Sequence, residues 1–98
     1  MIATRFFLGT PQVDKLQVYS VPSGRRGIVK QILLLNTTDN ESKLTVTINA
    51  IDVMKDFVVG AKETKIVDLV TALESGETIS LQQSTPNAIN VLISGEYE

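Results

Sequence analysis

The sequence contains no cysteine, no histidine and no tryptophan, and two of these absences exclude whole classes of chemistry. Without cysteine there can be no disulfide, no thiolate nucleophile and no zinc site built on sulfur. Without histidine there can be no Ser-His-Asp or Cys-His arrangement, because no imidazole is present to accept the proton of a nucleophile. Ordinary triad hydrolysis is therefore excluded.

Carboxylates are the remaining side chains that could perform acid–base chemistry. Four of them lie near the ends of expected strands: Asp52, Asp56, Asp68 and Glu74. Nothing in their spacing makes two of them face one another, and solvated surface charges are the better interpretation. We therefore expect no enzymatic activity, no catalytic residue and no cofactor.

Two short polar segments could bind ions. Asp39-Asn40-Glu41 offers oxygen ligands of the kind that Ca²⁺ accepts, but the EF-hand spacing of acidic positions around a glycine is absent. Ser23-Gly24-Arg25-Arg26-Gly27 could cradle an anion with backbone amides and forked arginine donors, but it matches neither the Walker pattern nor a dinucleotide fingerprint. We interpret the first as a plain loop and the second as a turn with two solvated arginines, and we expect no metal site.

A cationic excess and long apolar runs are also lacking. Nine Lys and Arg residues stand against eleven Asp and Glu residues, a net charge of −2, so nucleic acid is not an expected partner. No stretch approaches the roughly 20 apolar residues of a membrane span, and residues 1–8 lack the charged start and long apolar middle of a secretory signal. We expect a soluble protein with no membrane partner.

Aromatic side chains are scarce, being limited to Phe6, Phe7, Tyr19, Phe57 and Tyr97. Carbohydrate-binding modules usually stack sugar rings on exposed aromatic side chains, so this thin supply counts against such a role. Burial of a phenylalanine stabilises a fold by about 1.5–3 kcal/mol. We therefore expect Phe57 and either Phe6 or Phe7 in the core.

What the sequence does contain is enough apolar material for one folded unit. Of its 98 residues 43% are hydrophobic and 20% are charged, which is far from the profile of a disordered chain. The length suits one domain, which we expect to span residues 1–98. A chain this short buries only a modest fraction of its surface, so oligomerisation would add to its stability.

Alternation of apolar and polar residues at period two predicts strands. The clearest case is residues 44–50, where we expect Ile48 to face the core and Thr47 to face away from it. The same alternation recurs at residues 78–82 and 89–94, each preceded by a turn signal, and predicts antiparallel pairing of these strands.

Other segments complete an all-β pattern. Strands are expected at 6–8, 16–21, 27–37 (buried on both faces), 56–60 and 64–68, with a turn at 60–63. Residues 66–73 also carry the i, i+3, i+4, i+7 stripe of a short amphipathic helix, but their β-branched side chains favour a strand. The total is about eight short antiparallel strands, typical of a β-sandwich or barrel.

Several of these turns and strands resemble a pattern found in small virion proteins of tailed bacteriophages. In that pattern a Y-x-V-P-x-G turn, here residues 19–24, leads into an apolar strand that ends in N-T, here residues 36–37. Residues 73–79 resemble the companion L-x-x-G-D-T-I turn, with Glu77 in place of the usual Asp, and residues 89–95 resemble a closing strand that ends in S-G.

The resemblance covers most of residues 16–97, and its motifs are structural, so it speaks to fold more than to role. Gly24 and Gly76 would lie where turns need a positive φ, and Pro22 would end a strand. It implies a single antiparallel β-sandwich, similar to the jelly-roll modules that serve as capsid decoration, neck, or tail and fibre accessory subunits. Such proteins are generally homo-oligomers and carry no catalytic residues.

Two functions from different classes follow. The leading expectation is a non-enzymatic structural protein of a bacteriophage virion, made in the host bacterial cytoplasm, whose partners are its own copies in a trimer or hexamer and other virion proteins. The alternative is a small binding module for host-surface carbohydrate or protein on a tail or baseplate. A flat apolar outer patch would favour the first, and an exposed Tyr19 or Tyr97 beside carboxylates in a groove would favour the second.

Overall fold

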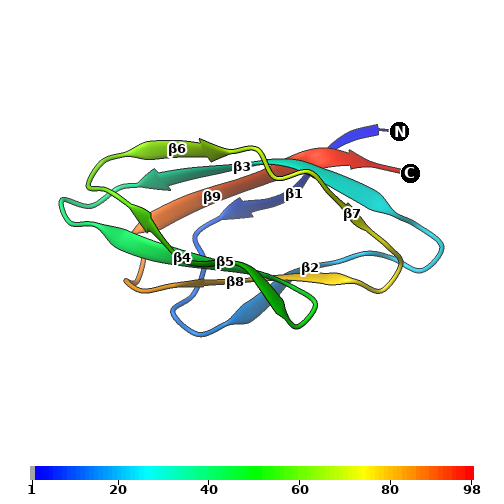
Figure 1. The fold of residues 1–98 in the computed structure, drawn as a ribbon, viewed down its shortest axis with the longest axis horizontal. Helices are drawn as coiled ribbons and strands as arrows, with labels where there is room; N and C mark the ends of the chain where they lie inside the picture. Colours follow the sequence, from blue (N-terminus) through cyan, green and yellow to red (C-terminus); the bar gives the residue numbers. More distant parts are fainter. Residues whose placement is uncertain (1) are drawn as a thin grey trace.

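Two facing β-sheets make up the computed structural model, which describes residues 2–98 (Figure 1). Within these residues there are strands, turns and loops, and no helix. The strands are β1 (Ile2–Gly9), β2 (Leu16–Ser20), β3 (Gly27–Asn36), β4 (Ser42–Ile48), β5 (Ile51–Val59), β6 (Thr64–Val67), β7 (Thr71–Leu73), β8 (Thr78–Gln83) and β9 (Ile89–Tyr97). Met1 lies outside the described residues.

The strand order is that of a jelly roll. Sheet A has the order β1-β9-β3-β6, with β7 also pairing with β3, and sheet B has the order β2-β8-β4-β5. Every pair is antiparallel. The predicted antiparallel β-sandwich is therefore confirmed. The expected eight strands become nine because two short strands, β6 and β7, share the place beside β3.

The segment with helical spacing, residues 66–73, forms the end of β6 and the whole of β7, so its β-branched side chains decide its conformation. The strand predicted at 44–50 ends earlier, at Ile48, because Asn49 adopts a left-handed conformation (φ 56°) in the tight turn to β5. The turn predicted at 60–63 is present, but it carries the chain from sheet B to sheet A.

The predicted pairing of three alternating strands is half right. β4 and β8 pair in sheet B, whereas β9 lies in the opposite sheet between β1 and β3. Alternation of apolar and polar residues shows which residues of a strand share a face. It does not show which other strand lies beside that strand.

The core fills the space between the sheets. Its fully buried side chains are almost all aliphatic and come from every sheet strand except β2 and β6: Phe6, Val21, Val29, Ile32, Leu34, Leu44, Val46, Val59, Leu73, Ile79, Leu81, Ala88, Ile89, Val91 and Ile93. Phe6 is thus in the core, as expected, with its ring edge-on to Tyr19 at a centroid distance of 5.0 Å. Phe57 is only half-buried.

The predicted faces of β4 are confirmed, but the outer face is not exposed at Thr47. Ile48 packs against the core and Thr47 points away from it, yet Thr47 is only 2% exposed. The reason is a polar cover over β4. The Thr47 hydroxyl donates to the Asp52 carboxylate at 2.6 Å, and Lys15 reaches the same carboxylate from the start of β2 at 3.1 Å. The outer face of β4 is therefore enclosed at Thr47 by Asp52 and Lys15.

The two turns that carry the resemblance lie against each other. Gly24 and Gly76 have φ of 78° and 82°, which confirms the expected left-handed positions. The Val21 amide donates to the Glu77 carbonyl and the Gly76 amide to the Val21 carbonyl, both at 3.0 Å. Segments more than 50 residues apart in sequence thus close one end of the sandwich together.

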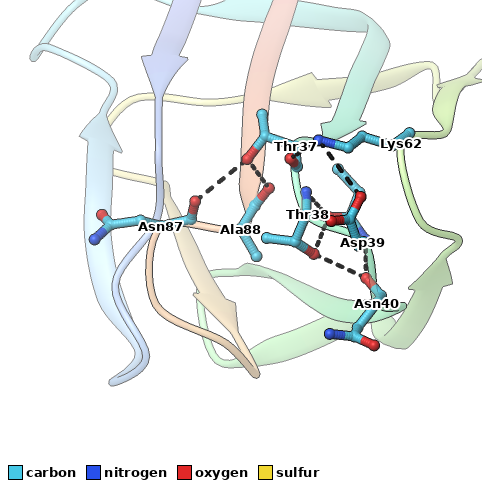
Figure 2. A network of polar contacts seen from close by, with 8 residues as sticks. Thr37, Thr38, Asp39, Asn40, Lys62, Asn87 and Ala88 are labelled. Atoms are coloured by element: carbon cyan, nitrogen blue, oxygen red, sulfur yellow. Dashed lines mark hydrogen bonds and ion pairs between the residues drawn. The ribbon is translucent and has the colours of Figure 1, made fainter.

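At the other end a buried asparagine organises the loop after β3. The Asn36 amide nitrogen donates to the carbonyls of Asn40 (2.8 Å) and Val59 (3.0 Å), and its oxygen accepts from the Thr38 amide (2.9 Å) and hydroxyl (2.8 Å). Figure 2 shows the surrounding contacts, in which Lys62 donates to the Thr37 carbonyl at 2.8 Å. The loop is therefore held by hydrogen bonds to the end of β5, to Lys62 and to the residue before β9.

Candidate functional site

The four carboxylates considered for catalysis lie apart. Asp52 and Asp56 belong to β5 at the edge of sheet B, Asp68 follows β6 on sheet A, and Glu74 lies in the turn after β7. Asp52 is held by Thr47 and by lysines, and Asp56 lies in a cleft with Lys43 and Lys55. The structure does not bring two of these carboxylates together as an acid–base pair.

Asp52 and Glu77 are the acidic groups whose pKa values are lowered. The hydrogen bond from the Thr47 hydroxyl, followed by that from Lys15, lowers the pKa of Asp52. The backbone amide of Glu74 (2.7 Å) and then the amide of Asn49 (2.6 Å) lower the pKa of Glu77. Both carboxylates therefore have a structural role, because their hydrogen bonds connect neighbouring strands or turns.

The two ion-binding segments are engaged in contacts within the chain. Arg26 forms an ion pair with Glu98 at 2.9 Å, and the Arg25 guanidinium lies 5.9 Å from the ring centroid of Tyr97. Asp39 lies 3.7 Å from Lys62 in the network of Figure 2. Residues 2–98 contain no cluster of three or more acidic side chains placed to hold a metal ion.

The outer face of sheet A carries a continuous row of aliphatic side chains that crosses β1, β9, β3 and β6. Leu8 lies opposite Leu92, Leu92 opposite Leu33, and Leu33 opposite Ile66. Residues directly opposite in an antiparallel pair present their side chains on the same face. The end members Leu8 and Ile66 are 59% and 58% exposed, and the two central leucines are half-buried. We call these four residues the aliphatic row.

A second row runs beside the aliphatic row, two positions along the strands, and it is polar. Arg5 lies opposite Ser94, and Ser94 lies opposite Gln31. Asp68 follows the last residue of β6, and with Gln31 and Ser94 it lines a shallow hollow of about 500 Å³. The polar row therefore has a cation at the β1 edge of the sheet and an anion at the β6 edge.

Sheet B carries a different feature, a polar cleft of about 290 Å³ over β4, which we call the sheet B cleft. Its lining includes Lys43 and Ser84 on one side, Lys55 and Asp56 on another, and Val13 of the loop before β2. Asp56 has a positive φ of 48° where β5 departs from regular pairing with β4, and its amide donates to the Thr45 hydroxyl at 3.1 Å. The irregular strand fixes the position of this carboxylate.

Neither tyrosine forms a platform for a sugar ring. Tyr19 is half-buried against Phe6, where burial and then the neighbouring Tyr97 raise its pKa. Tyr97 is half-buried beneath Arg25. The exposed tyrosine in a groove that would favour a carbohydrate-binding module is therefore absent from residues 2–98.

Comparison with known proteins returns no match to a protein-family model and no match to a curated protein. Within residues 2–98 no helix is long and apolar enough to cross a membrane.

The aliphatic row was not predicted as a surface feature. The sequence predicts a strand at 27–37 that is buried on both faces, which places Leu33 in the interior, whereas Leu33 lies half-buried on the open side of sheet A. Leu8 and Ile66 lie on opposite edges of sheet A with two strands between them, so they can be related only through the strand order.

Proposed function

We propose that the protein is a non-enzymatic structural subunit of a bacteriophage virion, a capsid decoration, neck or tail accessory protein, that acts by self-association and by docking on the particle. The observation that carries this proposal is the aliphatic row. Contiguous exposed apolar side chains on a small soluble protein mark an interaction surface. The jelly roll is a fold that viral capsid domains use, and the turns that resemble the phage pattern close one end of the sandwich.

Self-association suits the size and charge of the chain. A sandwich of 98 residues has a high ratio of surface to volume, and covering one sheet face adds buried apolar area that the monomer lacks. The net charge of −2 offers little repulsion between copies. We propose a closed homo-oligomer, with the trimer and hexamer as the leading stoichiometries because they match the symmetry of phage capsids and tails.

The test of self-association is sedimentation velocity over a wide concentration range. The wild-type chain should sediment as a species heavier than 10.7 kDa, and Leu8→Lys should shift it toward the monomer by placing charges in the aliphatic row. Ile51→Lys is the matched control, since Ile51 is 68% exposed but lies on β5 of sheet B. A wild-type mass that stays at 10.7 kDa would contradict self-association.

Docking on a particle needs a separate measurement. Mass spectrometry of purified virions from the phage that encodes the chain should detect it among the structural proteins. Its absence from washed particles would contradict the virion assignment, whatever its oligomeric state in solution.

A second function, a small binding module, is favoured by the sheet B cleft. Lys43 and Asp56 both line this cleft, and neither forms an ion pair with another part of residues 2–98. A mixture of donors and acceptors suits a hydroxyl-rich ligand. Titration of the ¹⁵N-labelled protein with glucose, galactose and N-acetylglucosamine should then shift the amide signals of Thr45 and Ser84, and the absence of any saturable shift would contradict this alternative.

A further inference from the structure

We propose that the outer face of sheet A binds the same face of a second copy, about a two-fold axis parallel to the strands, and that Arg5 of each copy pairs with Asp68 of the other. The inference rests on the self-association part of the proposed function and specifies its geometry. Figure 1 shows β1, β9, β3 and β6 as one layer of the sandwich, with sheet B on its other side only.

The first support is that this face holds two exposed charges without partners. Neither Arg5 nor Asp68 forms an ion pair with any group of residues 2–98. The two other charged residues that line the hollow with Asp68 are Lys30 and Glu96, which are paired with each other at 3.0 Å. The charges left over are thus one cation and one anion, at opposite edges of one sheet.

The second support is that one symmetry operation brings apolar side chains of the aliphatic row together and also pairs the opposite charges of the polar row. A two-fold axis that lies in the interface, parallel to the strands and midway between β9 and β3, exchanges the two edges of the sheet. Leu8 then faces Ile66 of the second copy and Leu92 faces Leu33 of the second copy, so apolar groups meet apolar groups. The same operation places Arg5 opposite Asp68 twice in each dimer.

A two-fold axis perpendicular to the strands does not pair Arg5 with Asp68. A two-fold axis along the aliphatic row places Leu8 opposite Leu8 of the second copy. It also turns the polar rows of the two copies to opposite sides of the contact. Arg5 and Asp68 then both remain without partners. Both axes keep the strands of the two facing sheets nearly aligned, which is the usual geometry when one sheet packs on another, so the charges decide between them.

A stable dimer needs only part of the surface of the chain. A standard interface buries roughly 800 Å² on each partner, which is about 15% of the accessible surface of 5388 Å². An isologous contact gives a dimer, and three such contacts join two trimers into a hexamer of dihedral symmetry, whereas a trimer alone would need another surface.

Charge reversal tests the pairing by sedimentation velocity. Arg5→Asp alone and Asp68→Arg alone should each raise the dimer dissociation constant about 10-fold or more, because each creates two like-charge contacts per dimer. The double variant carries both reversals and should return to within about three-fold of the wild type. An equimolar mixture of the two single variants should also associate, because a mixed dimer contains only opposite-charge contacts.

The control is Lys43→Asp on sheet B, which changes the net charge by the same amount as Arg5→Asp and should leave the dissociation constant unchanged. Single reversals without effect, or no recovery in the double variant and the mixture, would overturn the pairing. The proposed self-association would survive that result if Leu8→Lys still produced monomers. A wild-type chain that is monomeric at every concentration would overturn both.

Discussion

Replacing Asn36 by Ala should destabilise the protein by about 2–4 kcal/mol. The side chain is fully buried and makes four hydrogen bonds, of which the one to the Val59 carbonyl is buried and the other three are partly buried. Leaving a buried polar group unsatisfied costs about 1–3 kcal/mol, and partly buried groups recover some of this from water. A domain of this length has a total stability of roughly 5–15 kcal/mol, so the loss is a large part of it.

Urea unfolding followed by circular dichroism measures this loss, and thermal melting should show a fall of about 10–25 °C in Tm. Asn40→Ala is the control, because the Asn40 side chain is exposed and only its backbone carbonyl accepts hydrogen bonds, so its effect should stay within about 0.5 kcal/mol. A loss below about 1 kcal/mol for Asn36→Ala would refute the reasoning, since the loop would then hold its shape without the amide.

Three further predictions concern the polar cover over β4 and one crowded glycine. Thr47→Asp should cost about 3 kcal/mol or more in urea unfolding, because it buries a carboxylate beside Asp52, whereas Thr47→Val should cost about 1 kcal/mol. Gly95→Ala should lower Tm by several degrees at a cost of about 1–3 kcal/mol, because the new Cβ would overlap the Ile28 carbonyl oxygen; an unchanged Tm would contradict this close approach. The lowered pKa of Asp52 means that its carboxylate stabilises the fold above the ordinary value of 3.8 and that this contribution is lost as pH falls through the lowered pKa. The stability difference between wild type and Asp52→Asn should therefore be fully present at pH 7 and should shrink only as the pH falls below 3.8.

The parts of the fold that sequence could predict are those set by local chemistry. The glycines of the two turns, Gly24 and Gly76, were expected at positive φ and have it. The strand at 44–50 was found by its alternation, although its last two residues form a turn. The placement of β9 in the opposite sheet from β4 could not be predicted, because that choice depends on contacts between distant segments.

The exposure of strand faces is also a property of the whole fold. Alternation correctly separated Thr47 from the core-facing residues of β4, but it could not reveal that Lys15 and Asp52 close over this face. In the same way Leu33 was predicted to be buried because nothing in its own strand indicates that sheet A has no second cover. Both errors depend on how other strands and loops pack around a segment, which its own alternation does not report.

The two candidate surfaces lie on opposite sides of the sandwich, which determines how they can be used together. A dimer formed through the outer faces of sheet A would leave both copies of sheet B, and thus both sheet B clefts, facing outward. Self-association through Arg5 and Asp68 would therefore not block binding at Asp56. An assembly built in this way would present two identical clefts in opposite directions, so one cleft could contact a particle while the other stayed accessible. The structural and binding roles can therefore be tested separately, because a variant in one surface leaves the other surface intact.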